Sequence, residues 1–365
     1  MKHIVIDARI INSSTGTYVE RLLHYLQEID KENRYTILIP TKDNNYWKPT
    51  ATNFKVLNAD FANYSINEQI GFKKLLDSLS PDLVHFCMPQ QPIFYRGTHV
   101  TTVHDLTLLK VYNSDKNWLL FHIKQLIGHF VFRAVAKSSQ HIIVPTKFTK
   151  NDLLKFAKVS PEKITITYES ADVSTEKIEP YDSPFDKFIL YVGQQSDYKN
   201  IKKLGDAHQN LLKRHPKLGL ILVGKINDSA KANQDYFNSK GYKNIHFTGF
   251  LPNSQRDWLY KNTTAYIFPS LFEGFGLPGL EAMGYGAPVV SSNATCLPEV
   301  YGDAAIYFDP NSTDEMSAAI EKIISDDKLR SNQIKKGYKQ LAKYSWLRMA
   351  KQTHSIYLDA INNKR

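Results

Sequence analysis

Two glutamates, Glu273 and Glu281, flank seven residues, three of them glycines, in the stretch LFEGFGLPGLEAMGYGAPVVSSN. Proline suits the first turn of a helix, so we predict a helix that begins near Pro278. Glu273 then lies in the loop before it, and Glu281 about one turn inside. Glycines let backbone N–H groups approach a ligand, a helix N-terminus favours anions, and ionised carboxylates accept hydrogen bonds from hydroxyls. The stretch therefore predicts a pyrophosphate site flanked by two diol-binding carboxylates. A helix start with acidic residues that complement the helix dipole is the simpler alternative.

A lysine after an earlier strand points to the same ligand. The run ILYVGQQSDYKNIKKL predicts a strand that ends at Gly193, a short loop, and Lys199 at the start of the next helix. A lysine there opposes the helix dipole, so an anionic partner is expected. A diphosphate would serve, and a solvated surface lysine is the alternative.

Two further segments could carry chemistry in the first half of the chain. TTVHDLTLL ends a strand with His104 and Asp105, but no further ligand spacing accompanies this pair, so it is weak evidence for a metal. His104 could reach a cleft from the strand's carboxyl end, or it could be a hydrogen-bonded core histidine. DARIINSSTGTYVERLL places a Ser/Thr/Gly loop that contains Gly16 between the first strand and helix. It lacks the GxGxxG spacing of a dinucleotide fold, which argues against a dehydrogenase.

The elements that position these residues form a regular alternation. Short apolar runs bounded by turn residues suit strands that are buried on both faces, and helical patterns such as TYVERLLHYLQEID and INEQIGFKKLLDSLS separate them. The fold class is therefore α/β with parallel sheets. The predicted strands are 3–8, 35–40, 54–59, 83–87, 99–105, 141–146 and 163–168, then 188–193, 218–224, 244–249, 265–270, 287–292 and 304–309.

The chain divides into two predicted domains. Its 365 residues exceed one compact core, and a polar segment with two prolines interrupts the alternation. We predict a first domain over 1–172, a hinge over 173–186 and a second domain over 187–345. The tail, 346–365, predicts an amphipathic helix that packs on the body. Ligands of open α/β sheets bind beyond the carboxyl ends of the strands, where the candidate residues lie.

Composition limits the class of protein. The net charge of +10 calls for an anionic partner, yet no nucleic-acid motif accompanies the scattered lysine clusters, so no nucleic acid is expected. Solvated helix faces and contact with an anionic membrane remain open for these clusters. For the helix predicted over 116–138, core packing is favoured over membrane contact. No signal peptide or run of about 20 apolar residues is visible, and the two cysteines have no metal-like spacing. We expect a cytoplasmic protein, with peripheral contact at the inner membrane face left open.

Taken together, these residues resemble the retaining glycosyltransferases of GT-B fold, group 1, family four. The most specific part is FPSLFEGFGLPGLEAMGYGAPVVSSN, which is similar to the family's Glu-(seven residues)-Glu motif. Further similarity lies in VHDL, SPDLVHF, HIIVPTKFTKNDLLKF and LPEVYGDAAIYFDP, so it covers nearly the whole chain. The resemblance implies two Rossmann-like domains that face a cleft, with a tail helix that crosses back to the first.

The resemblance also implies a role for each candidate residue. Glu281 would hold the ribose hydroxyls of a nucleotide-sugar donor, and Lys199 its diphosphate. His104 would contact the sugar near its reacting face, and the Gly16 loop would close over the phosphates. Glu273 would hold the donor sugar together with the backbone of Gly274, Phe275, Gly276 and Leu277. Gly193 and Gln194 would belong to the donor-binding loop; many relatives carry an arginine after this glycine, where this chain has Gln194 and Gln195.

The implied reaction moves a mannose- or glucose-like hexose from a nucleotide diphosphate sugar to a glycan or lipid-linked acceptor of the cell envelope. Lys199 and the helix N-terminus would stabilise the departing diphosphate, so neither a metal nor another cofactor is expected. A second hypothesis is a nucleotide-sugar-binding protein that has lost transferase activity, motivated by Gln194 and by TYESADV (167–173), where relatives usually have an Asn-Gly turn.

Overall fold

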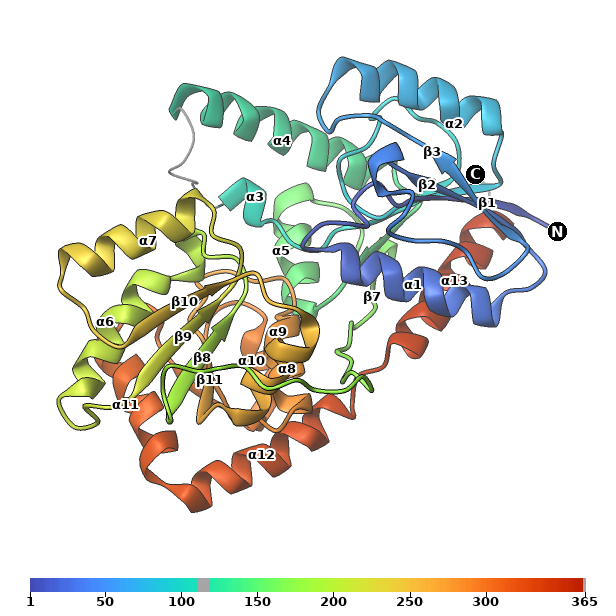
Figure 1. Cartoon of the computed structure of the whole chain (residues 1–365). Helices are drawn as coiled ribbons and strands as arrows, with labels where there is room; N and C mark the ends of the chain where they lie inside the picture. The colour runs from blue at the N-terminus through green and yellow to red at the C-terminus, as the bar shows by residue number, and fades with distance from the viewer. Residues whose placement is uncertain (111–117, 364–365) are drawn as a thin grey trace. The chain divides into compact units, whose positions relative to one another are not determined.

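The computed structural model describes residues 1–110 and 118–363, which form two compact units. Of these residues, 1–110, 122–169 and 345–363 belong to the first unit, and 118–121 and 170–344 belong to the second. Each unit is built on its own parallel β-sheet (Figure 1). The hinge predicted over 173–186 stays a prediction. Residues 116–117 and 364–365, the ends of two predicted helices, lie outside the described residues.

The first unit contains a seven-stranded sheet in the order β3-β2-β1-β4-β5-β6-β7, with every neighbouring pair parallel. All seven strands predicted for this half are confirmed. Continuous apolar runs identified them because both faces of such a sheet are covered. The strands are β1 (His3–Asp7), β2 (Arg34–Ile39), β3 (Phe54–Asn58), β4 (Leu83–Phe86), β5 (His99–Thr102), β6 (His141–Val144) and β7 (Ile164–Ile166).

The helices of this half follow the predicted alternation with one local difference. The pattern over 66–80 divides into a π-helical turn, η2 (Glu68–Phe72), and the α-helix α2 (Lys73–Leu79). The wider turn coincides with the place where the Glu68 carboxylate enters a buried ion cluster. The remaining elements are α1 (Gly16–Ile29), η1 (Thr41–Asp43), α3 (Thr107–Lys110), α4 (Trp118–Ser138), α5 (Lys147–Ala157) and η3 (Pro161–Lys163).

The tail forms helix α13 (Trp346–Asn362), which belongs to the first unit. It packs against α1 and against β4, β5 and β6. Its inward face carries Trp346, Met349, Ile356, Tyr357 and Ala360, as the helical spacing predicted. His354 Nε2 lies 2.8 Å from Asp30 Oδ2, directly after α1, so a polar contact adds to the apolar packing. The helix that follows the second domain in sequence is therefore part of the first unit.

The second unit contains a six-stranded parallel sheet in the order β10-β9-β8-β11-β12-β13. The strands predicted for this half are also confirmed. They are β8 (Phe188–Val192), β9 (Gly219–Val223), β10 (Ile245–Gly249), β11 (Ala265–Phe268), β12 (Val289–Ser292) and β13 (Ala305–Phe308).

Helices connect these strands, as parallel pairing requires. The helix predicted to begin near Pro278 is α9, which begins at Leu277. The connecting elements are η4 (Asp197–Lys199), α6 (Ile201–Leu212), α7 (Asp228–Ser239), α8 (Asn253–Asn262), α9 (Leu277–Gly284), α10 (Leu297–Tyr301), η5 (Gly302–Ala304), α11 (Thr313–Ser325) and α12 (Asp327–Leu341).

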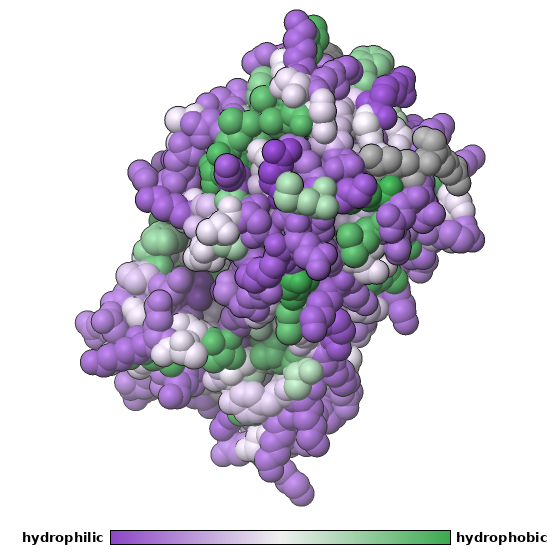
Figure 2. All heavy atoms as spheres, turned by 90° about the vertical axis from the view of Figure 1, so that its right-hand side faces the viewer, coloured by the Kyte–Doolittle hydropathy of each residue, from purple (hydrophilic) through white to green (hydrophobic). Residues whose placement is uncertain are grey.

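The face shown in Figure 2 is predominantly hydrophilic, with apolar side chains gathered in separate clusters. In residues 1–110 and 118–363, no helix combines the length and the apolar character needed to cross a membrane.

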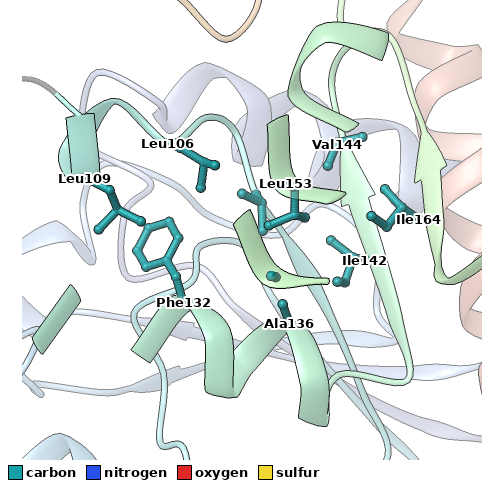
Figure 3. Packing of buried hydrophobic residues seen from close by; sticks show 10 residues of the cluster. Leu106, Leu109, Phe132, Ala136, Ile142, Val144, Leu153 and Ile164 are labelled. Atoms are coloured by element: carbon teal, nitrogen blue, oxygen red, sulfur yellow. The ribbon is translucent and has the colours of Figure 1, made fainter. Parts of the chain in front are cut away.

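A compact apolar cluster supports the segment that carries His104. Val103 and Leu106, on either side of this histidine, are buried together with Phe132 from α4 and Leu153 from α5 (Figure 3). The cluster continues to β6 and β7 through Ile142, Val144 and Ile164. The position of His104 therefore depends on packing between α4, α5 and the sheet.

Leu153→Ala tests this support. The side chain is fully buried, so its removal should lower the free energy of unfolding of the first unit by about 2–5 kcal/mol. Leu126→Ala is the matched control, because Leu126 on α4 is 72% exposed and its loss should cost less than about 0.5 kcal/mol. Chemical unfolding measures both values, and equal costs would contradict the assignment of Leu153 to the core.

Candidate functional site

The second sheet brings two candidate loops together. Strands β8 and β11 are parallel neighbours, and the strand order reverses between them. Ligands of open α/β sheets bind beyond the carboxyl ends of the strands at such a switch point. The loop after β8 carries Gly193 to Lys199, and the loop after β11 carries Glu273 to Gly276. The candidates that are far apart in the chain therefore leave the sheet at the same place.

Close backbone packing forms the start of the β8 loop. The Gly193 N–H donates to the Val223 carbonyl at 2.9 Å. A Cβ on Gly224, whose φ is +158°, would lie 2.2 Å from the Gly193 oxygen, so glycine is needed at residue 224. Gln194 is exposed, and its carbonyl accepts a hydrogen bond from the Tyr191 hydroxyl at 2.5 Å. The side chain at residue 194 brings no positive charge to this loop.

Lys199 forms a largely buried ion pair with Glu273. Its Nζ lies 2.5 Å from Glu273 Oε1. Burial lowers the pKa of Lys199, but the attraction of Glu273 outweighs it, and the pKa is raised. Lys199 is therefore a cation at neutral pH.

The prediction that Lys199 begins a helix needs one correction. Lys199 ends the 3-10 turn η4, and α6 begins only at Ile201, because Asn200 between them adopts a left-handed conformation with φ +62°. The anionic partner in this structure is Glu273, since a carboxylate of the same unit already neutralises the lysine. A diphosphate at this position would share or replace that contact.

Hydrogen bonds to Thr295 and Cys296 hold the loop around Glu273. The Glu273 N–H donates to Thr295 Oγ1 at 3.2 Å, and the Cys296 thiol donates to the Glu273 carbonyl at 3.3 Å. In the described part of the chain, no hydrogen bond is formed by the N–H groups of Phe275 and Gly276. These donors precede the N-terminus of α9 and remain available to an anion.

The glycines of this loop also have packing reasons that the sequence did not reveal. Gly276 has φ +94°, and its carbonyl accepts from the Tyr301 hydroxyl at 2.5 Å. A Cβ on Gly279 would lie 2.3 Å from the Tyr301 ring. Gly279 therefore serves the packing of α9 against α10, and the close approach to a ligand falls to the residues before α9. The Phe275 ring is buried, so only its backbone can face a ligand.

Glu281 lies one turn inside α9, as predicted, and is partly buried. Its Oε2 accepts a hydrogen bond from the Tyr260 hydroxyl at 3.2 Å. Burial raises the pKa of Glu281, and the nearby charge of Arg256 on α8 opposes this effect. Sequence reasoning missed Arg256, whose charge acts on this carboxylate and whose guanidinium lies 2.9 Å from Asp257 Oδ1. Its only sequence signal is the Arg256-Asp257 pair in a polar helix.

His104 lies in the first unit and is bound on both ring nitrogens. Its Nε2 lies 3.0 Å from the Cys87 carbonyl oxygen, and its Nδ1 lies 3.4 Å from Glu169 Oε1. The Tyr18 ring packs edge-on, 4.9 Å away. Burial lowers the pKa of His104, but the hydrogen bond and charge of Glu169 outweigh it, and the pKa is raised. Both acceptors favour the doubly protonated imidazolium.

Glu169 was not predicted as a partner of His104. It lies in TYESADV, the segment that departs from the family pattern, and its side chain is buried. The only signal in the sequence was this departure from the family pattern. It places a glutamate in the segment, and a buried carboxylate needs a polar partner.

Gly16 is the first residue of α1. A Cβ here would lie 1.9 Å from the Ile11 carbonyl oxygen, so only glycine fits. The loop from Ala8 to Thr15 is therefore folded tightly against the start of the helix. Its closure over phosphates stays a prediction.

Comparisons with known proteins agree with this architecture. The model of the glycosyltransferase family 4 matches residues 15–175, and the model of the glycosyl transferases group 1 matches residues 174–340. The chain belongs to the group 1, family 4 glycosyltransferases. The two matches meet close to the boundary between the two units.

Curated relatives of this glycosyltransferase include enzymes of O-antigen synthesis. The chain is 29% identical over 273 residues to O-antigen chain mannosyltransferase B of Escherichia coli, covering 71% of this chain and 69% of that one. It is also 29% identical over 267 residues to the serotype-specific mannosyltransferase WbdA of Escherichia coli. That match covers 69% of this chain and only 32% of WbdA, so the chain spans about a third of that relative.

Solved structures confirm the GT-B fold. A sucrose-phosphate synthase from Thermosynechococcus elongatus matches with a TM-score of 0.76 at 16% identity, covering 98% of this chain and 99% of that one. Anabaena Alr3699/HepE in complex with UDP and glucose matches with a TM-score of 0.72 at 16% identity, covering 98% and 99%.

The described residues of this glycosyltransferase suit anion and hydroxyl binding. Lys199 and the free N–H groups before α9 supply positive charge, while Glu273 and Glu281 supply acceptors on either side. Within residues 1–110 and 118–363, no group of three or more His, Cys, Asp and Glu side chains could hold a metal ion.

Glu169→Gln tests the state of His104. Glu169 raises the pKa of His104. The contribution of the His104–Glu169 pair to the stability of the fold is therefore fully present below about pH 6.5, and it is lost as the pH rises through the raised pKa of His104. The variant should be less stable than the wild type by about 1.5–3 kcal/mol at pH 5.5, and by less at pH 8.5. Chemical unfolding at several pH values measures this difference.

The control is Glu28→Gln, which removes the exposed partner of His24 and should change stability little at any pH. A Glu169→Gln effect that stays constant, or grows as the pH rises, would contradict the assigned pair.

Proposed function

We propose that this glycosyltransferase moves a hexose, most simply mannose, from a nucleotide diphosphate sugar to a glycan or lipid-linked acceptor in polysaccharide synthesis. The observation that carries the proposal is the Lys199–Glu273 pair beside the free N–H groups before α9, with Glu281 one turn further on. This arrangement offers a cation, backbone donors and two carboxylates, which are the groups that a diphosphate, a sugar and a ribose need.

The names of the relatives support the choice of sugar and setting. Mannosyltransferase B and WbdA are both mannosyltransferases, and the former acts in O-antigen chain synthesis by its name. The HepE structure contains UDP and glucose, which supports a nucleotide-sugar donor in this fold. We place the reaction in the cytoplasm, with peripheral contact at the inner membrane face as part of the proposal.

In the proposed reaction, the bond between the anomeric carbon and the diphosphate oxygen breaks first. Negative charge then develops on the leaving phosphate and positive charge on the sugar. Lys199 and the N–H groups of Phe275 and Gly276 stabilise the leaving group without reorganisation. Glu273 and Glu281 accept hydrogen bonds from the hydroxyls of the sugar and the ribose.

The acceptor hydroxyl attacks on the face from which the phosphate departs, so the anomeric configuration is retained. The departing phosphate takes the acceptor proton, and no protein base or metal is required. His104 contacts the sugar in this proposal and, as an imidazolium, donates hydrogen bonds only.

Two observations favour a second candidate, a nucleotide-sugar-binding protein without transferase activity. Gln194 brings no charge to the β8 loop, and Glu273 neutralises Lys199. Such a protein would bind the donor but release no nucleoside diphosphate.

A ligand panel tests the proposed function. Thermal shifts are measured with UDP, GDP, ADP, dTDP and their common sugars, with and without EDTA. A ligand at a hundred times its dissociation constant adds about 2.7 kcal/mol to the free energy of unfolding. Nucleotides of one base should therefore stabilise the protein more than the others, and EDTA should not remove this stabilisation. Release of nucleoside diphosphate in the presence of glycan acceptors then separates the transferase from the binding protein. No stabilisation by any nucleotide would refute both.

Glu281→Gln tests the ribose contact. Loss of a charge-assisted hydrogen bond worth about 1.5–3 kcal/mol should raise the dissociation constant of the nucleotide sugar about 10- to 100-fold. Titration calorimetry measures it, with the melting temperature of the ligand-free variant as a check on folding. Glu176→Gln, an exposed change in the same unit, should leave affinity unchanged. Unaltered affinity in Glu281→Gln would remove Glu281 from the donor site.

A further inference from the structure

The first sheet has its own switch point, between β1 and β4. These strands are parallel neighbours, with β2 and β3 on one side and β5 to β7 on the other. Asp7 ends β1, and the loop after β4 runs through Gln90. Ligand sites are expected beyond this edge as in the second sheet.

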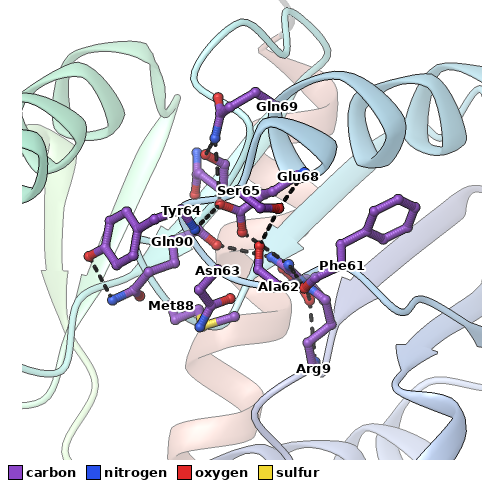
Figure 4. A network of polar contacts seen from close by, with 12 residues as sticks. Arg9, Phe61, Ala62, Asn63, Tyr64, Ser65, Glu68, Gln69, Met88 and Gln90 are labelled. Carbon is purple, nitrogen blue, oxygen red and sulfur yellow. Dashed lines mark hydrogen bonds and ion pairs between the residues drawn. The ribbon is translucent and has the colours of Figure 1, made fainter. Parts of the chain in front are cut away.

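A buried arginine occupies this edge. Arg9 Nε lies 2.8 Å from Asp7 Oδ1, and Nη2 lies 2.8 Å from Asp7 Oδ2. Nη1 lies 3.0 Å from Glu68 Oε1 (Figure 4). All three side chains are almost completely buried. The single arginine thus ties the end of β1 to the π-helical turn η2.

The same guanidinium also binds two backbone carbonyls. Nη1 donates to Phe61 at 2.9 Å, and Nη2 donates to Gln90 at 3.0 Å. Its five N–H groups are then all used, and the Phe72 ring lies against it at 4.2 Å. The segment from residue 61 to residue 72 and the loop after β4 are locked to β1 through Arg9.

Gln69 joins the two segments a second time. Its Oε1 accepts from the Ile93 N–H at 2.9 Å, and its Nε2 donates to the Gln91 carbonyl at 3.2 Å. Gln90 Nε2 donates to the Tyr64 hydroxyl at 3.0 Å. The two segments therefore form one fixed surface.

This fixed surface exposes large apolar side chains. Tyr64 is 44% exposed, Ile66 79%, Ile70 54% and Phe94 58%. Ile66 and Ile70 lie one turn apart on either side of Gln69, and Phe94 follows its partner Ile93. Single exposed apolar residues are common, but four on two locked segments form a patch. We call these four residues the loop patch.

The loop after β4 connects the loop patch to a contact of His104. The Cys87 carbonyl, 3.0 Å from His104 Nε2, lies at the start of the loop whose Gln90 carbonyl binds Arg9. Exposed cations flank the patch, because Lys74 lies one turn after Ile70 and Arg96 two residues after Phe94. An apolar ligand that also carries a phosphate would find complementary groups here.

We propose that the loop patch binds the apolar chain of a lipid-linked acceptor, and that Arg9 is the positioning residue that holds it. The inference rests on the proposed function and narrows its acceptor to a glycan joined to an alkyl or polyprenyl chain. Apolar side chains exposed at the carboxyl edge of the first sheet are covered when the acceptor is bound, whereas a purely polar glycan would leave them in water.

Direct binding of a short-chain probe tests the proposal. Octyl α-D-mannopyranoside, below its micelle concentration, is compared with methyl α-D-mannopyranoside by titration calorimetry in the presence of the nucleoside diphosphate that the panel selects. The octyl glycoside should bind at least about tenfold more tightly, because several methylene groups leave water. Equal affinities, or no binding of the octyl glycoside, would overturn the proposal.

Variants test which residues cause the preference for the octyl glycoside. Ile66→Ser, Ile70→Ser and Phe94→Ser together should reduce the octyl affinity to that of the methyl glycoside. The control, Leu126→Ser with Phe130→Ser, changes two other exposed apolar residues of the first unit and should keep the preference. A preference that survives the triple variant, or that the control abolishes, would overturn the proposal.

Arg9→Lys and Gln69→Ala test the positioning. Lysine keeps the positive charge but cannot make the five hydrogen bonds of Arg9. Alanine at residue 69 removes the hydrogen bonds to Ile93 and Gln91 and leaves no buried charge without a partner. Each should lower the octyl affinity several-fold while the thermal shift by the nucleotide, which binds the second unit, is unchanged. A Gln69→Ala variant with full octyl preference would remove the positioning role.

Two other partners would appear as distinct outcomes. If the triple variant loses binding to phosphatidylglycerol vesicles while its octyl affinity is unchanged, the patch contacts a bilayer, and the acceptor proposal is wrong. A change in sedimentation at unchanged octyl affinity would assign the patch to contact between copies of this chain, and the acceptor proposal would be wrong.

The failure of the proposed function and the failure of this inference can be told apart. If nucleotides fail to stabilise the wild type, the proposed function fails. If nucleotides stabilise it and the octyl preference is absent, only this inference fails.

Discussion

The candidate donor site depends on one ion pair, between Lys199 and Glu273. It joins the loop after β8 to the loop after β11, at the switch point of the second sheet. Breaking a buried pair leaves an uncompensated charge and costs about 3–5 kcal/mol, so the two loops are strongly held together. The pair also keeps a cation beside the N-terminus of α9 without a ligand. An incoming diphosphate would exchange one anionic partner for another, with little rearrangement of the lysine.

In the first unit, two polar side chains away from the solvent are also paired. Arg9 is buried and His104 is partly buried, and each has its donors directed at carboxylates and backbone carbonyls. Buried polar groups need such partners, since an unpaired group in a low-dielectric interior is costly. In both cases the partners come from loops after different strands. The carboxyl edge of the first sheet is therefore fixed by hydrogen bonds, and apolar side chains on those loops can remain exposed.

The two switch points carry different chemistry. The one in the second sheet combines a lysine, free backbone donors and carboxylates, which suits a charged donor. The one in the first sheet has its charges neutralised within the Arg9 cluster and presents apolar side chains with cations at the margin. Membership of the group 1, family 4 glycosyltransferases accounts for two such sheets in one chain.

Local patterns in the sequence were enough for the elements, and tertiary contacts decided the site. The strands could be predicted because continuous apolar runs mark strands buried on both faces, and Pro278 marked the start of α9. Glu273 and Glu281 could be named from their spacing around that start. The partners could not, because Lys199 and Glu273 are 74 residues apart, and Arg9 is 59 residues from Glu68 and 81 from Gln90. A pairing of charges across such separations depends on strand order and loop packing, which no local pattern encodes.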